Sequence, residues 1–72
     1  MDIIKRIESH YPDMTRKQKQ IADFLLQNQD TLTFITLKEL SVQVGVTEIT
    51  ILNLCKRLGY SNFNEVKYEF RK

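Results

Sequence analysis

The sequence holds 72 residues, of which 42% are hydrophobic and 28% charged, so it fits one small globular domain rather than a disordered segment. A single cysteine excludes an internal disulfide and is typical of a reducing compartment such as the cytoplasm. No apolar run approaches the roughly 18 residues of a membrane span, no secretory signal opens the chain, and the net charge of +2 permits a polyanionic partner without demanding one.

Start and stop signals delimit the first two predicted helices. Residues 2–10 place three isoleucines at helical spacing, and this run ends before the Tyr-Pro-Asp turn at 11–13. Thr15 and Gln18 have the spacing of a capping box, in which the hydroxyl accepts from a free backbone N–H and the amide returns a hydrogen bond. The apolar stripe behind them fades at residues 28–30, where we expect the second helix to end.

The middle of the chain predicts a connector followed by a short helix. Residues 31–35, TLTFI, are rich in β-branched and aromatic types, but a lone five-residue strand has no partner here. We expect a connector whose apolar residues close the core. Thr36 and Glu39 then form a second capping box, and Gly45 stands where a helix-ending left-handed conformation is needed.

Two more helices complete the prediction. Thr47 caps the fourth helix and Gly59 ends it. Its apolar residues stand at spacings i, i+3, i+4 and i+7: Ile51, Leu54, Cys55 and Leu58. Asn62 and Glu65 form a third capping pattern, which opens a helix that runs to the end of the chain. The sequence therefore predicts an all-α fold, a small bundle of five helices with no strand.

The third and fourth helices have the arrangement of a helix-turn-helix. Residues 37–44, the turn Gly45-Val46-Thr47 and residues 48–58 follow one another, and helices joined by such a turn cross at roughly 90–120°. We expect a homeodomain-like motif over about residues 37–56, with Val46 between the helices. Glycine helix stops are common in any small helical bundle, so the spacing leaves a plain bundle open.

The outward face of the fourth helix is the predicted contact surface. A helix fits the major groove of B-DNA, where its early residues touch base edges while flanking cations meet phosphates. We expect phosphate contacts from Lys38, Thr47, Lys56 and Arg57. We expect sequence preference to come from Glu48, Ile49, Thr50 and Asn53. The alternatives are structural: helix caps for the threonine hydroxyls, solvated surface for the charges, and packing against a neighbouring helix for Leu52.

Residues 15–72 resemble the N-terminal DNA-binding domain of the RpiR family of bacterial transcriptional regulators. The stretches TRKQKQIADFLLQN, ITLKELSVQVGVTEITI and LCKRLGYSNFNEVK carry the resemblance, together with their separation. It implies binding of duplex operator DNA as a homodimer. Members of the family usually continue into a sugar-isomerase-like domain that senses phosphorylated sugars and helps dimerisation. This chain ends at Lys72 without room for that domain, so we expect the DNA-binding fragment of a longer regulator of sugar metabolism genes.

Two positions depart from the family pattern. The family commonly has arginine at the position of Asn53 and a small residue at the position of Ile49. Asparagine reads adenine edges rather than guanine, and an apolar side chain can touch thymine methyl groups. The two departures predict either a different operator or that these two side chains do not contact bases.

Other functions remain as alternatives or are not expected. Cys55 lies on an apolar face and His10 stands alone at a helix end, so we expect no catalysis. The sequence has no CxxC, no HExxH and no glycine-rich phosphate loop, so we expect no cofactor and no metal. The rival hypothesis is a protein-interaction module, which the low net charge favours. Its apolar edge would comprise Ile49, Leu52, Tyr68 and Phe70.

Overall fold

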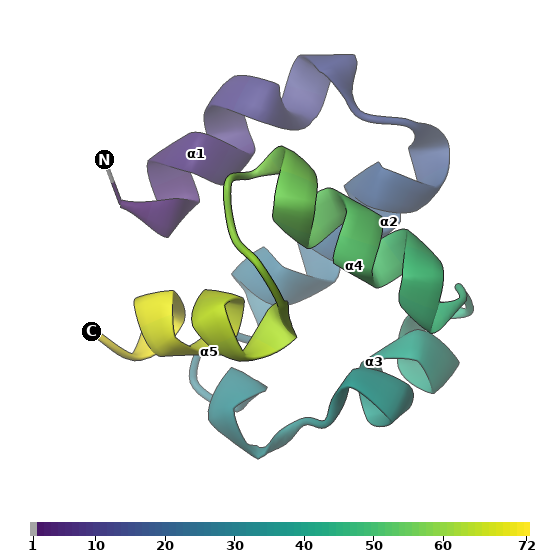
Figure 1. Cartoon of the computed structure of the whole chain (residues 1–72), viewed down its shortest axis with the longest axis vertical. Helices are drawn as coiled ribbons and strands as arrows, with labels where there is room; N and C mark the ends of the chain where they lie inside the picture. The colour runs from purple at the N-terminus through teal and green to yellow at the C-terminus, as the bar shows by residue number, and fades with distance from the viewer. Residues whose placement is uncertain (1) are drawn as a thin grey trace.

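The computed structural model describes residues 2–72, and this range contains five α-helices, two short 3₁₀ turns and no strand (Figure 1). The helices are α1 (Ile3–His10), α2 (Arg16–Gln27), α3 (Leu37–Val44), α4 (Glu48–Arg57) and α5 (Phe63–Arg71). The turns are η1 (Tyr11–Asp13) and η2 (Leu32–Phe34). The predicted all-α fold with five helices is therefore confirmed.

Side chains hold the starts of α2 and α3 as the capping boxes predicted. The backbone N–H of Thr15 donates to Oε1 of Gln18 at 3.0 Å, and the Gln18 N–H donates to the Thr15 hydroxyl at 3.2 Å. Thr36 and Glu39 exchange the same two bonds, both at 3.0 Å. These bonds satisfy N–H groups that the first turn of a helix leaves free, which fixes where each helix begins.

The cap of α5 differs from the predicted box in one bond. Oδ1 of Asn62 accepts from the Glu65 N–H at 2.9 Å, as expected. The Glu65 carboxylate, however, accepts from the N–H of Ser61 at 2.6 Å and not from that of Asn62. Asn62 has an extended backbone (φ −160°, ψ 176°), so the N–H within reach of the carboxylate is the one before it.

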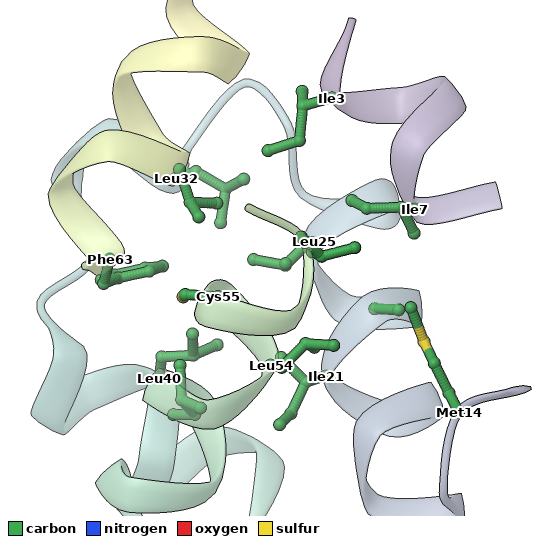
Figure 2. Packing of buried hydrophobic residues seen from close by; sticks show 14 residues of the cluster. Ile3, Ile7, Met14, Ile21, Leu25, Leu32, Leu40, Leu54, Cys55 and Phe63 are labelled. Carbon is green, nitrogen blue, oxygen red and sulfur yellow. The ribbon is translucent and has the colours of Figure 1, made fainter. Parts of the chain in front are cut away.

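The core lies around α4, which contacts α2, α3 and α5. Figure 2 shows Leu54 and Cys55 of α4 among side chains from the surrounding elements. The largest fully buried side chains come from all five helices, η2 and the loop after α4: Ile7, Ile21, Leu32, Leu40, Ile51, Leu54, Leu58 and Val66. Burying one such side chain is worth about 1.5–3 kcal/mol, so each helix is held mainly by its contribution to this cluster.

The connector closes the core less completely than its apolar composition predicts. Leu32 in η2 is buried and Ile35 is half-buried, but Phe34 is 79% exposed. Val42, in the apolar run of α3, is 72% exposed. A five-residue connector cannot turn every side chain inward, and an eight-residue helix buries only the face that meets its neighbours.

Both glycines adopt the left-handed conformation that a helix end requires. Gly45 has φ +80° and Gly59 has φ +97°. The Gly45 N–H donates to the carbonyl of Ser41 at 2.9 Å, which ends α3. After α4, Nη1 of Arg6 donates to the carbonyl of Leu58 at 2.9 Å, so a side chain of α1 satisfies the last turn and holds α1 against it.

Candidate nucleic-acid interface

The turn between α3 and α4 is built from residues 45–47. The N–H groups of Gly45 and Val46 both donate to the carbonyl of Ser41, at 2.9 and 3.1 Å. Val46 is half-buried and packs against the core. The hydroxyl of Thr47 accepts from the Thr50 N–H at 3.2 Å, which confirms Thr47 as the cap that begins α4.

Helix α4 has one buried face and one open face. Ile51, Leu54 and Cys55 are buried in the core. Five of the predicted contact residues of α4 are exposed: Glu48, Ile49, Asn53, Lys56 and Arg57. Ile49 is 69% exposed, so little of this apolar side chain packs against other groups within residues 2–72. The structure thus gathers these five residues on the outward side of a single helix.

The two threonines of the predicted interface are already bonded to each other. The hydroxyl oxygens of Thr47 and Thr50 lie 2.9 Å apart, and Thr50 is half-buried. Each hydroxyl is therefore used in the helix start, although a hydroxyl oxygen can accept more than one hydrogen bond. The first turn of α4 is fixed before any partner arrives.

The predicted cations divide into free and bonded side chains. Lys38 is exposed near the start of α3, and Lys56 is exposed on α4. Neither side chain makes a hydrogen bond or an ion pair within residues 2–72. Arg57 is different: Nη1 donates to Oε1 of Gln18 at 3.2 Å, and Nη2 donates to the carbonyl of Asp13 at 3.0 Å. Arg57 thus links the end of α4 to the start of α2.

This link places a second pair of basic residues near the end of α4. Arg16 and Lys17 occupy the first turn of α2 next to Gln18, and both are exposed. Because the bonding partners of Arg57 lie 39 and 44 residues away, no local pattern could show that the start of α2 lies beside the end of α4.

Leu52 lies at the edge of the open face. It is half-buried and lines a surface hollow with Leu37 at the start of α3 and Phe63 and Lys67 of α5. Leu52 thus faces the hollow between α3 and α5, and its packing against a neighbouring helix stays a prediction. The Lys67 side chain is held nearby, since its Nζ donates to the carbonyl of Ile35 at 3.1 Å.

The thiol of Cys55, the candidate nucleophile, is shielded from solvent. Cys55 is buried, and this burial raises the pKa of its thiol to about 11, so the thiol stays protonated at neutral pH. Nδ1 of His10 lies 2.9 Å from the carbonyl of Arg6 within its own helix. Within residues 2–72, His, Cys, Asp and Glu form no group of three that could hold a metal ion, and no helix is long and apolar enough to cross a membrane.

Comparisons with known proteins agree with this arrangement. The profile of a family described as "Helix-turn-helix domain, rpiR family" matches residues 1–72. Over 68 residues the chain is 31% identical to an uncharacterized HTH-type transcriptional regulator of Haemophilus influenzae, covering 94% of this chain and 24% of that protein. A regulator of Thermotoga maritima is 32% identical over 68 residues (93% and 24%), and HexR of Pseudomonas aeruginosa is 24% identical over 68 residues (94% and 24%).

The chain thus spans about a quarter of the length of the curated relatives it matches. The family is one of transcriptional regulators and not a class of enzymes. The profile covers the whole chain, including α1, which lies before the stretches that carry the resemblance seen in the sequence. On this match, the chain belongs to the rpiR family of helix-turn-helix domains.

Proposed function

We propose that this chain binds duplex DNA by placing the open face of α4 in the major groove, as the DNA-reading part of a longer bacterial transcriptional regulator. The observation that carries the proposal is the division of α4: its inner residues are buried, while Glu48, Ile49 and Asn53 are exposed and make no side-chain hydrogen bond within residues 2–72. A helix held by one face and open on the other can enter the groove without unfolding anything. The name HTH-type transcriptional regulator, carried by the relatives, supports the same function.

The proposed roles follow from the positions of the side chains. Glu48, Ile49, Thr50 and Asn53 supply sequence preference, and Lys38, Thr47, Lys56 and Arg57 supply affinity and position. Arg57 keeps N–H groups for a phosphate because a guanidinium has five and two of them are used within the chain. Arg16 and Lys17 extend the basic surface along the flanking phosphates.

The finer parts of the proposal concern the longer protein. We propose that it acts in the cytoplasm as a homodimer and controls genes of sugar or sugar-phosphate metabolism. A phosphorylated sugar would act through a second domain outside this chain. The family resemblance supports these statements, and the length of the relatives leaves room for such a domain.

The first experiment is a titration of the ¹⁵N-labelled chain with a random-sequence duplex, at low and then higher salt, observed through amide NMR shifts. We expect shifts on residues 47–57 that fade with salt, because phosphate contacts release counterions. Shifts spread evenly over all basic residues would contradict groove reading by α4. Shifts that salt does not affect would instead favour the protein-interaction module.

Alanine variants distinguish contacts with phosphates from contacts with bases. Lys56→Ala should weaken binding to every duplex and reduce the salt slope by about 1, because it removes one phosphate contact. Lys72→Ala removes the same charge at the residue after α5, where it is paired with Glu69, and should leave the slope unchanged. Asn53→Ala should relax preference at one base pair, worth roughly 1–3 kcal/mol, in a binding-site selection. If Asn53→Ala weakens all duplexes equally, its assigned role is wrong.

A further inference from the structure

On the outward face of α5, acidic and basic side chains flank an exposed aromatic ring. Glu65, Tyr68 and the pair Arg71 and Lys72 are spaced three and four residues apart, so they lie on one side of the helix. Tyr68 is 52% exposed, and Glu65, Arg71 and Lys72 are exposed as well. None of these four residues is among those proposed to contact DNA.

The contacts along this face leave one charge near each end of α5 outside any ion pair within residues 2–72. At the start of α5, the carboxylate of Glu65 accepts from the N–H of Ser61 and so stays near the first turn. At the end, the Arg71 guanidinium lies 5.8 Å and the Lys72 ammonium 5.3 Å from the centroid of the Tyr68 ring. The Lys72 ammonium also forms an ion pair with Oε2 of Glu69 at 3.2 Å, so the charges without an ion pair within residues 2–72 are Glu65 before the Tyr68 ring and Arg71 after it.

Such a face is complementary to itself when a second copy is turned around. If two α5 helices lie antiparallel with Tyr68 opposite Tyr68, residues equally far from position 68 in opposite directions face each other. Glu65 of each copy then meets Arg71 of the other, and the two tyrosine rings meet at the centre. In a parallel pair Glu65 would face Glu65 and Arg71 would face Arg71, which is repulsive. The charges therefore select the antiparallel, twofold arrangement.

We infer that α5 is a self-association surface, on which a second copy of this chain docks antiparallel through Glu65, Tyr68 and Arg71. A helix of nine residues is about 14 Å long, and a pair that short buries less than the roughly 1,200 Å² of a stable interface. The pairing is therefore weak in the chain alone and adds to other contacts in a longer protein. It deepens the homodimer proposed above but does not depend on DNA binding.

Disulfide trapping, without DNA, detects a weak pairing of this kind. Tyr68→Cys places two thiols at the twofold axis, whereas Val42→Cys places one on α3, where the side chain is more exposed (72% against 52%). Random collision should cross-link the Val42→Cys chain at least as fast. We expect the Tyr68→Cys chain to cross-link faster, with the buried Cys55 unreactive in both. Equal rates, or a faster Val42→Cys chain, would overturn the inference.

Charge reversal identifies the geometry. In the Tyr68→Cys background, Glu65→Lys and Arg71→Glu should each slow cross-linking roughly three- to tenfold, because every paired contact becomes repulsive. Mixing the two variants restores both contacts, so the mixed disulfide, recognised by its mass, should form at the original rate. If the mixture is as slow as the separate variants, the antiparallel pairing is wrong.

Circular dichroism checks that both variants are folded. Arg71→Glu does not change the start of α5, where Glu65 bonds to Ser61. It therefore tests the antiparallel pairing even if Glu65→Lys unfolds the helix. If Arg71→Glu cross-links as fast as its parent, the inference fails whatever the DNA titration shows.

Discussion

At the scale of single residues, the two glycines meet different surroundings although both have positive φ. A Cβ atom added to Gly45 would find nothing within 4 Å. A Cβ atom added to Gly59 would lie 2.6 Å from Nη1 of Arg6, the atom that donates to the carbonyl of Leu58. When a side chain is added at Gly45, backbone strain is therefore the whole cost in folding free energy. At Gly59 it is only part of that cost.

Alanine substitutions should separate these two costs. Gly45→Ala should destabilise the fold by about 1 kcal/mol through the left-handed conformation alone. Gly59→Ala should cost about 1 kcal/mol more, because it also displaces a charged hydrogen bond. Urea unfolding followed by circular dichroism measures both. In an Arg6→Ala background the two substitutions should cost the same, and a difference that persists there would contradict the role given to Arg6.

At the scale of one element, the start of α3 depends on the charge of Glu39. The Thr36 N–H that donates to its carboxylate, and then the Thr36 side chain, lower the pKa of Glu39. The folded state thus binds this proton less readily than the unfolded state. The stabilisation is present above the unfolded value, about 4.3, and is lost as the pH falls through the lower folded pKa.

Neutral substitution should remove this pH dependence. Glu39→Gln keeps an acceptor for the Thr36 N–H, so we expect its urea midpoint to fall less between about pH 6 and about pH 3 than that of the parent chain. Glu8→Gln is a matched control, since Glu8 is exposed on α1 and makes no side-chain hydrogen bond within residues 2–72. If the urea midpoint of Glu39→Gln falls with pH as much as that of Glu8→Gln, the charge of Glu39 contributes nothing to the capping box of α3.

The element scale also limits what the sequence can predict about the fold. Capping boxes were predictable because both partners stand three residues apart, and the glycine stops were predictable because other residues avoid positive φ. The exposure of Phe34 was not predictable, because an apolar pattern identifies candidates for burial but not the neighbours that would cover them. The Glu65 bond to Ser61 depends on the extended backbone of Asn62, which the residue types do not specify.

Part of the candidate interface was also predictable from the sequence, and part was not. The open face of α4 followed from its apolar spacing, which fixed the opposite side as exposed. The link from Arg57 to α2 did not, since it joins residues that only the packing of α2 on α4 brings together. Side-chain bonds between elements depend on the tertiary structure, so a local pattern could assign Arg57 to phosphate but could not find its partners in the chain.

At the scale of the whole molecule, Cys55 reports on the integrity of the core. Its thiol is buried at the centre of the bundle, and burial raises its pKa to about 11 (Figure 2). In the unfolded chain the thiol loses its proton near pH 8.5. The folded state therefore holds the proton more tightly, and stability should decline as the pH rises from about 8.5 toward about 11.

Comparing the parent chain with Cys55→Ala measures this contribution. Between about pH 8 and about pH 10, the urea midpoint of the parent should fall more steeply than that of the variant. Tyr11, whose pKa is raised chiefly by its hydrogen bond to Asp23, and Tyr60, whose pKa is raised by burial, are present in both proteins and cancel. Parallel curves would show that the thiol is solvated in the folded state.

The division of α4 into a buried face and an open face affects how a domain of this kind can change its DNA specificity. Ile49 and Asn53 are exposed and form no side-chain hydrogen bond within residues 2–72, whereas Thr47 and Arg57 hold the helix start and the contact with α2. Mutation can therefore sample new chemistry at the first two positions while the free energy of folding stays nearly constant. A randomised library at Ile49 and Asn53 should consist mostly of folded proteins, and the same library at Thr47 and Arg57 should not. Duplicated copies of the gene could drift apart in specificity one codon at a time without passing through unfolded intermediates.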